Sequence, residues 1–437
     1  ARATRSGSLG AGRAPGQSTP RSLPVSEACP SRSNRGEGSG STHPDGGSLC
    51  VVLVISPLTV GEASRFSGVR IVVAPDDFKG SLTADAAARA IAQGWRRVAP
   101  EDELDLCPMS DGGPGFVDTL AAALGGELIG ATIRGPLGEQ TPGVVLVVGD
   151  TAYVESAQAC GLHLLAADQR NPAEATTYGV GELLRLAIAA GATRIMVGLG
   201  GSATTDGGAG MLAALGATAD VPLDVGGLAL RPITKFDIAA ALEVVADVEL
   251  IAATDVDNPL LGLTGAAKVF GAQKGADDNL VLQLDAALEA FASVVGRRAD
   301  GKDPAVAKGS GAAGGLGYGL MCLGAHRVAG ISTIIEATDL EARIRASDLV
   351  ITGEGLFDWQ SMRGKVVTGV ATVTMPTARP CVVIAGDVVV GRREFSALGV
   401  SSAYSVADVV GSVEASLADP VGTLAQTAER VARTWSH

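Results

Sequence analysis

The chain has 437 residues, enough for roughly two or three domains. Apolar residues make up 46% of it and aromatic residues only 3%, so the core must consist mainly of Ala, Val, Leu and Ile. The formal net charge of −13 argues against a nucleic-acid-binding protein, because such proteins neutralise phosphates with clustered Lys and Arg.

Cysteine and histidine are too scattered to indicate a zinc centre or a hydrolase. None of the six cysteines forms a CxxC pair, and none of the four histidines lies in an HExxH motif. We expect reduced, mostly buried thiols in a cytoplasmic protein. Hydrolysis by a Ser or Cys nucleophile with a His partner has little support.

Residues 1–68 are expected to form a disordered N-terminal extension. Most of this segment is rich in Ser, Gly, Arg and Pro, and it cannot bury enough apolar surface to offset its ordering entropy. We favour a linker or upstream segment without function over a targeting peptide, because the segment lacks a clear amphipathic helix. Its apolar run at residues 49–55 is far shorter than the ~20 residues of a membrane span, so no membrane association is expected.

Beyond residue 68, apolar runs alternate with helical periodicity. Residues 69–74 predict a buried strand, and apolar positions at helical spacing after Thr83 predict a helix with one buried face. A strand over residues 103–109, a β-rich segment over 127–155 and a helix over 176–190 follow. Further strands are expected at residues 194–197, 249–253, 349–352 and 381–385.

The recurring order is strand, polar Gly-rich loop, helix. This order is typical of parallel α/β proteins, in which ligands bind beyond the carboxyl ends of the strands. Several of these loops combine an acidic residue with glycines. Such loops suit a site for phosphate and Mg²⁺, because glycine exposes backbone N–H groups and carboxylates bind the metal.

The first loops place charged side chains at strand ends. Lys79 and Ser81 lie just before a predicted helix, where free N–H groups and the helix dipole favour an anion. A capped turn with a solvated lysine would give the same pattern. Asp111 follows the second strand and is itself followed by two glycines, which fits a metal ligand but also an ordinary turn.

The most informative loop spans residues 198–210. Glycine occupies six of its thirteen positions, so its backbone can approach a ligand closely. Ser202 adds a hydroxyl that can donate to a phosphate oxygen, and Asp206 adds a carboxylate. Because a strand and a helix are predicted on either side, a flexible surface loop is the less favoured interpretation.

Two later loops supply further acids. Asp255 lies in the loop after the strand at residues 249–253, where it fits a Mg²⁺ ligand or an Asx-turn. Glu354, Asp358 and Lys365 lie within one short stretch after the strand at residues 349–352. The chain has neither a GxxxxGK[ST] motif nor the HRD and DFG motifs of protein kinases, so neither of those architectures is expected.

Seven segments in order resemble the motifs of the bacterial glycerate kinase family that makes 2-phosphoglycerate. They read APDDFKGSLTA, MSDGGPGF, NPAEATTYGVGEL, GLGGSATTDGGAGML, DVDNPLLGLTGAAKVFGAQKGA, GAAGGLGYGL and TGEGLFDWQSMRGKVVTGVA. The resemblance runs from Ile71 to Ala371. Departures from the family's usual residues include Asp77 for Ser, Pro114 for Glu, Thr205 for Asn and Ser361 for Thr.

The resemblance implies two α/β domains with parallel sheets and the site between them. One would be a flavodoxin-like domain built from both chain ends, at residues 69–114 and 266–437, and the other would be inserted at residues 115–265. It also implies an ATP-dependent, Mg²⁺-assisted kinase acting on D-glycerate. Small-molecule ligands, no nucleic acid or membrane partner and a monomer or homodimer are therefore expected.

The candidate site residues fall into three groups. The catalytic candidates are Lys79, Asp206 and Asp358, and the metal candidates are Asp255 and Asp111, with Asp206 also considered for Mg²⁺. The candidates for binding the nucleotide are Ser81, Gly200, Gly201, Ser202, Gly207, Gly208, Gly353, Glu354 and Lys365.

Two alternatives remain open from the sequence. Gly198-x-Gly-x-x-Ala203 follows a strand and opens a helix, as in dinucleotide-binding oxidoreductases that use NAD(P), although a lone fingerprint of this kind is weak. In the second alternative, the chain is a catalytically weakened homologue of the glycerate kinases that acts as a binding protein, because Pro114 stands where the family usually has Glu.

Overall fold

The computed structural model describes residues 68–436. The expected disordered extension therefore lies outside the described residues, except for Gly68. Among residues 68–436, no helix is long and apolar enough to cross a membrane.

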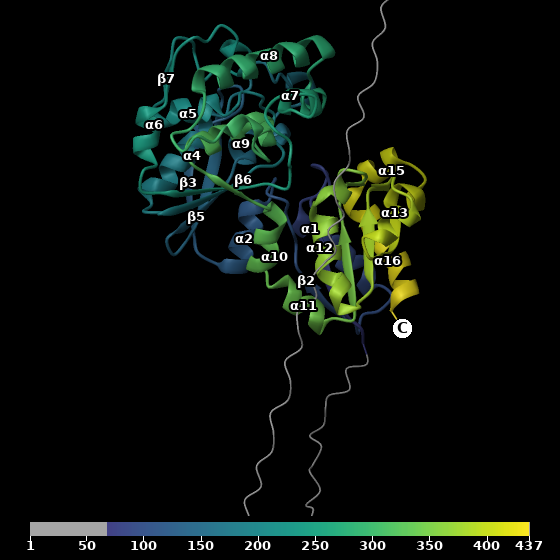
Figure 1. The fold of residues 1–437 in the computed structure, drawn as a ribbon. Helices are drawn as coiled ribbons and strands as arrows, with labels where there is room; N and C mark the ends of the chain where they lie inside the picture. The colour runs from purple at the N-terminus through teal and green to yellow at the C-terminus, as the bar shows by residue number, and fades with distance from the viewer. Residues whose placement is uncertain (1–67, 437) are drawn as a thin grey trace, which may run out of the picture. The chain divides into compact units, whose positions relative to one another are not determined.

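Five parallel strands form the first sheet (Figure 1). Their order is β15-β13-β11-β1-β2, which is the flavodoxin-like order 2-1-3-4-5 when the strands are numbered along the chain. The sheet takes strands from both ends of the described chain, as predicted. They are β1 (Arg70–Pro75), β2 (Glu103–Leu106), β11 (Leu349–Gly353), β13 (Cys381–Ala385) and β15 (Val400–Ser405).

Helices cover both faces of this sheet. Successive side chains of β1 point to opposite faces, so they pack alternately into two apolar cores. Ile71 and Val73 pack with α1 (Ala84–Arg96) and α16 (Pro420–Trp435), which lie side by side. Val72 and Ala74 pack on the other face with α12 (Val366–Thr374) and α10 (Gly330–Ala337). Burial on both faces explains why these strands are continuous apolar runs.

A second sheet has six strands and mixed direction. Its order is β10-β9-β6-β5-β4-β3. The β3–β4 and β4–β5 pairs are antiparallel, and the β5–β6, β6–β9 and β9–β10 pairs are parallel. The strands are β3 (Glu127–Arg134), β4 (Gln140–Val148), β5 (Thr151–Glu155), β6 (Arg194–Gly198), β9 (Glu249–Ala253) and β10 (His326–Val328).

A large core lies on the second sheet. It includes apolar residues of four helices: α4 (Tyr178–Ala189), α5 (Ala209–Leu215), α8 (Asp278–Val295) and α9 (Ala312–Cys322). Leu146 of β4 instead packs with α2 (Phe116–Leu124). Further elements are α3 (Ala157–Cys160), α6 (Ala239–Val244), α7 (Ala266–Phe270), α11 (Leu340–Ala346), α13 (Arg392–Ala397), α14 (Val406–Val410), α15 (Val413–Ala418), β7 (Thr218–Ala219), β8 (Phe236–Asp237), β12 (Leu356–Phe357) and β14 (Asp387–Val388).

The α/β class and the flavodoxin-like sheet are confirmed, whereas the second sheet is mixed rather than wholly parallel. That sheet also contains β10, far beyond residue 265, where the inserted domain was expected to end. The expected boundary therefore does not coincide with the edge of the sheet, and the division into domains stays a prediction.

Candidate active site

Three loops of the first sheet meet at the carboxyl ends of its strands. Beyond β2 the chain stays beside β1, since Met109 N donates to Pro75 O at 2.9 Å. On the other side, Asp76 N donates to Gly353 O at 2.8 Å. These bonds bring the loops that carry Asp76, Asp111 and Glu354 next to one another, as expected for parallel strands.

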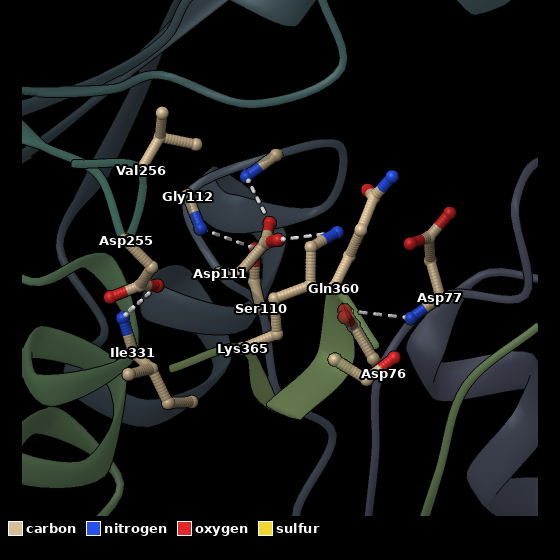
Figure 2. Close-up of polar contacts among 12 residues, drawn as sticks. Asp76, Asp77, Ser110, Asp111, Gly112, Asp255, Val256, Ile331, Gln360 and Lys365 are labelled. Carbon is tan, nitrogen blue, oxygen red and sulfur yellow. Dashed lines mark hydrogen bonds and ion pairs between the residues drawn. The ribbon is translucent and has the colours of Figure 1, made fainter. Parts of the chain in front are cut away.

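Asp111 lies at the centre of this group (Figure 2). One carboxylate oxygen accepts a hydrogen bond from Gly113 N at 3.1 Å, and the other lies 3.5 Å from Lys365 Nζ. Lys365 is the residue just before α12, so the start of that helix sets its position. Asp111 raises the pKa of Lys365 more than any other neighbour does, and Asp76 and Glu354 act in the same direction.

Carboxylates outnumber cations around this pair. Burial, together with the charge of Asp111, raises the pKa of Asp76 well above its usual value and that of Asp77 to about 6. Burial raises the pKa of Glu354 to about 7, although Lys365 and Lys79 oppose the shift. The loops therefore concentrate negative charge that a bound cation would neutralise.

Asp255 approaches the same group from the end of β9 in the second sheet (Figure 2). Its carboxylate accepts from Ile331 N at 3.1 Å, in the first turn of α10. Burial raises its pKa to about 7, with the charge of Asp111 as the second cause. The two candidate metal ligands are thus close enough to repel each other.

Lys79 occupies a strained position in the loop after β1. Its φ of 47° lies in the left-handed region, which is unusual for a lysine. A Cβ placed on Gly355 would lie 3.1 Å from Lys79 Cγ, so the lysine packs closely on the loop that carries Glu354. Strained residues of this kind cluster at functional sites, where the surrounding structure holds them in place.

The first part of the Gly-rich loop touches the loop of Asp111. A Cβ on Gly200 would lie 2.5 Å from Gly113 Cα, and one on Gly201 would lie 2.9 Å from the Pro114 ring. Gly201 also has a φ of 66°. Only glycine permits this approach, which places the Gly200–Gly201 backbone beside the carboxylate group.

Asp206, in the second part of that loop, makes a different set of contacts. Its fully buried carboxylate accepts from Thr177 N and Oγ1, at 2.9 and 2.8 Å, and from the N–H groups of Gly208 and Gly210, at 3.1 and 3.2 Å. Burial raises its pKa despite these bonds. Asp206 therefore fixes the loop to the start of α4, and no hydrogen bond among the described residues links it to Asp111.

The remaining candidates mostly shape their own turns. Ser81 Oγ donates to Phe78 O at 2.7 Å, and Asp358 accepts from Gln360 N at 2.8 Å. Gly353 ends β11, and a Cβ there would lie 1.9 Å from Ile384 O. Gly207 and Gly208 pack against α9, because a Cβ on Gly208 would lie 3.0 Å from Gly319 Cα.

Several residues of the group were not among the sequence candidates. Asp76 and Asp77 directly follow β1, and the charge of Asp111 raises the pKa of both. Gln360 lies between Asp77 and Lys365 in Figure 2. The two aspartates follow the predicted strand at residues 69–74 directly. An acid at a strand end was the signal that identified Asp111, and the same signal would have found them.

The donor chemistry of the group fits Mg²⁺. Its carboxylates raise one another's pKa, and Glu354 Oε1 is buried without a hydrogen-bond partner among residues 68–436. Within that range no three acidic, His or Cys side chains lie close enough to enclose a metal by themselves. Mg²⁺ usually takes only one or two carboxylates, together with waters and substrate phosphates.

The structure does not support a dinucleotide-binding fingerprint at residues 198–203. Gly198 ends β6, but α5 begins only at Ala209, so the fingerprint at residues 198–203 does not open a helix. Its glycines are instead used for close approach to Gly113 and Pro114.

Comparison with known proteins agrees with the motifs. The sequence model described as "Glycerate kinase family" matches residues 71–436. A glycerate kinase of Halalkalibacterium halodurans is 40% identical over 83% of this chain and 97% of its own length. A glycerate 2-kinase of Escherichia coli K12 is 38% identical over 84% of this chain and 98% of its own length.

A solved structure agrees as well. The crystal structure of a protein provisionally assigned as glycerate kinase 2, from Salmonella typhimurium LT2, superposes with a TM-score of 0.64. It is 36% identical in sequence, and the match covers 84% of this chain and 98% of that protein. The chain therefore belongs to the glycerate kinase family, and the prediction that it is a kinase is confirmed.

Proposed function

We propose that the protein transfers the γ-phosphoryl group of ATP to the 2-hydroxyl of D-glycerate, with Mg²⁺ as the metal. The observation that carries this proposal is the Asp111–Lys365 pair within a group of surplus carboxylates. The choice of O2 is supported by the name of the Escherichia coli relative, a glycerate 2-kinase.

Lys365 and Lys79 are two cations of this group. Phosphoryl transfer requires positioning and neutralisation of the charge on the transferring group. Lys365 remains protonated throughout the neutral range, because Asp111 raises its pKa. We assign Lys365 to the transferring phosphoryl group and Lys79 to an anionic group of either substrate.

Asp111 and Asp255 would hold the metal, and the Gly200–Gly201 backbone would approach the phosphates. The bound ion would supply charge neutralisation to the phosphate oxygens. The positive charge of the ion would also offset the repulsion between the carboxylates of Asp111 and Asp255.

A group that accepts the hydroxyl proton of D-glycerate completes the machinery. Glu354 and Asp77 have pKa values raised to about 7 and about 6, close to the pH at which a general base works best. Glu354 is the stronger candidate, because one of its oxygens is buried and makes no hydrogen bond with the rest of the described chain.

The test is release of ADP from ATP by the purified chain. ADP should form only when D-glycerate and Mg²⁺ are both present, and Asp111→Asn should lose most of this activity. ADP formation that does not depend on D-glycerate would remove D-glycerate as the substrate.

A further inference from the structure

A buried lysine, Lys274, contacts the Gly-rich loop at Ser202 and Thr204. It ends a short 3₁₀ turn (Ala272–Lys274) after α7, and its side chain is 2% exposed. Its Nζ lies 3.1 Å from Ser202 Oγ and 2.5 Å from the carbonyl oxygen of Thr204. Both of these acceptors are neutral groups.

Burying an ammonium group against neutral acceptors costs stability. Burial lowers the pKa of Lys274 to about 8, even though Cys160 of α3 and Asp206 of the loop, the titratable groups that face it, both act to raise it. A methionine would fill a similar volume without that cost. The ammonium group is therefore better explained by what it does to the loop than by packing.

The backbone on both sides of Ser202 is already fixed. Leu162 N donates to Gly201 O and Ala203 N donates to Cys160 O, each at 2.7 Å. Rotation of the Ser202 hydroxyl is the freedom that remains. Because Ser202 Oγ accepts from Lys274, its own proton must point elsewhere, and it has no acceptor among the described residues.

We propose that Lys274 is a positioning residue for phosphate binding, which turns the hydroxyl proton of Ser202 toward a phosphate oxygen of ATP. This inference rests on the proposed function and deepens it. Ser202 follows Gly200 and Gly201, which lie against the loop of Asp111, so a phosphate held near Asp111 would lie within reach of that loop. Lys274 itself is buried and acts through Ser202.

The test compares Lys274→Met with Lys302→Met, a lysine whose side chain is 79% exposed. Loss of one oriented hydrogen bond to a charged ligand should raise the KM for ATP by about 10- to 100-fold in Lys274→Met. The KM for D-glycerate should stay near the wild-type value. Lys302→Met should match the wild type in both constants.

A double-mutant cycle tests the route through Ser202. Ser202→Ala should raise the KM for ATP in the same direction, and the Lys274→Met, Ser202→Ala double variant should be no worse than Lys274→Met alone. In the wild type the KM for ATP should also rise above about pH 8, where Lys274 loses its charge, and Lys274→Met should lack this rise.

A lowered melting temperature with an unchanged KM for ATP in Lys274→Met, or additive effects in the cycle, would show a purely structural role and overturn the inference. If Lys274→Met does not fold, an unchanged KM for ATP in Ser202→Ala overturns it equally. If the wild type does not phosphorylate D-glycerate, the proposed function fails. Calorimetric binding of ATP to the same variants then still decides the role of Lys274.

Discussion

Single residues in this chain separate into those that build the charged group and those that hold its loops. Lys365 and Asp206 illustrate the difference. Lys365 pairs with Asp111 within a cluster of carboxylates, whereas Asp206 accepts from Thr177, just before α4, and from N–H groups that follow it in the chain. Substitutions at the two positions should therefore have different signatures.

Lys365→Met should lower kcat by about 100-fold, because a preorganised cation would be lost where charge develops in the transition state. Steady-state assays with saturating ATP and D-glycerate measure this. The control is Lys308→Met, whose side chain is 76% exposed. A kcat close to that of the wild type in Lys365→Met would contradict the assignment.

Asp206→Asn should mainly reduce stability, by about 2 to 3 kcal/mol, because a buried charged acceptor of several hydrogen bonds becomes a neutral one. Urea unfolding measures the change. Asp220 accepts a comparable set from Thr234 and Lys235 but lies at the surface, so Asp220→Asn should cost much less. Equal losses in the two variants would mean that burial of Asp206 does not matter.

At the scale of elements, close backbone approach fixes the Gly-rich loop. The start of α9 has left-handed residues from Ala313 to Gly315, and a Cβ on Gly314 would lie only 1.8 Å from Thr204 O. The carbonyl of Gly314 also accepts from Gly207 N at 3.1 Å. The helix start and the loop therefore depend on each other's backbone.

Gly314→Ala should destabilise the protein by about 3 kcal/mol, because it combines a forbidden contact with an unfavourable φ of 68°. Gly411→Ala is the control. Gly411 is also left-handed, with a φ of 100°, but has open space around it, so the expected loss is only about 1 kcal/mol. Thermal unfolding should separate the two, and similar melting temperatures would argue against the backbone contact.

The sequence predicted elements well where one signal dominated. The strand at residues 69–74 and the helix after Thr83 were recognisable, because β-branched runs and amphipathic spacing were undisturbed. The strand predicted over residues 103–109 ends at Leu106, although backbone bonds to β1 continue to Met109. That distinction depends on tertiary pairing, which local sequence does not encode.

The site was predictable in part for the same reason. Strand-end acids such as Asp111 and Asp255 could be identified, since parallel strands place their carboxyl ends together. The burial of Asp206 and Lys274 could not, because neither hydrogen bonding nor desolvation is visible in a glycine-rich string. Only the packing of α9 and α4 on the loop determines which of its polar groups face inward.

Carboxyl groups at the ends of strands in both sheets have raised pKa values, so the stability of the whole molecule should depend on pH. Burial raises the pKa of Glu155, at the end of β5, from 4.5 to about 7. The folded state then binds more protons than the unfolded state between those two values. The contribution of Glu155 is therefore fully present below about pH 4.5 and is lost as the pH rises through about 7.

Glu155→Gln should remove this dependence. Between pH 4.5 and 8, the wild type should lose up to about 3 kcal/mol relative to Glu155→Gln, as the pKa difference implies. Urea titrations at several pH values measure it. Glu127→Gln, at an exposed acid that begins β3, should follow the wild-type curve. Parallel curves for the wild type and Glu155→Gln would exclude a buried carboxyl with a raised pKa.

The central claim concerns the molecule as a catalyst: loops of both sheets meet at Asp111 to transfer a phosphoryl group to D-glycerate. The most direct test is a ³¹P NMR spectrum of the full chain incubated with ATP, Mg²⁺ and D-glycerate. The account predicts resonances of ADP and 2-phosphoglycerate, which Asp111→Asn should fail to produce. A product phosphorylated at O3, or an unchanged spectrum of ATP and D-glycerate, would contradict it.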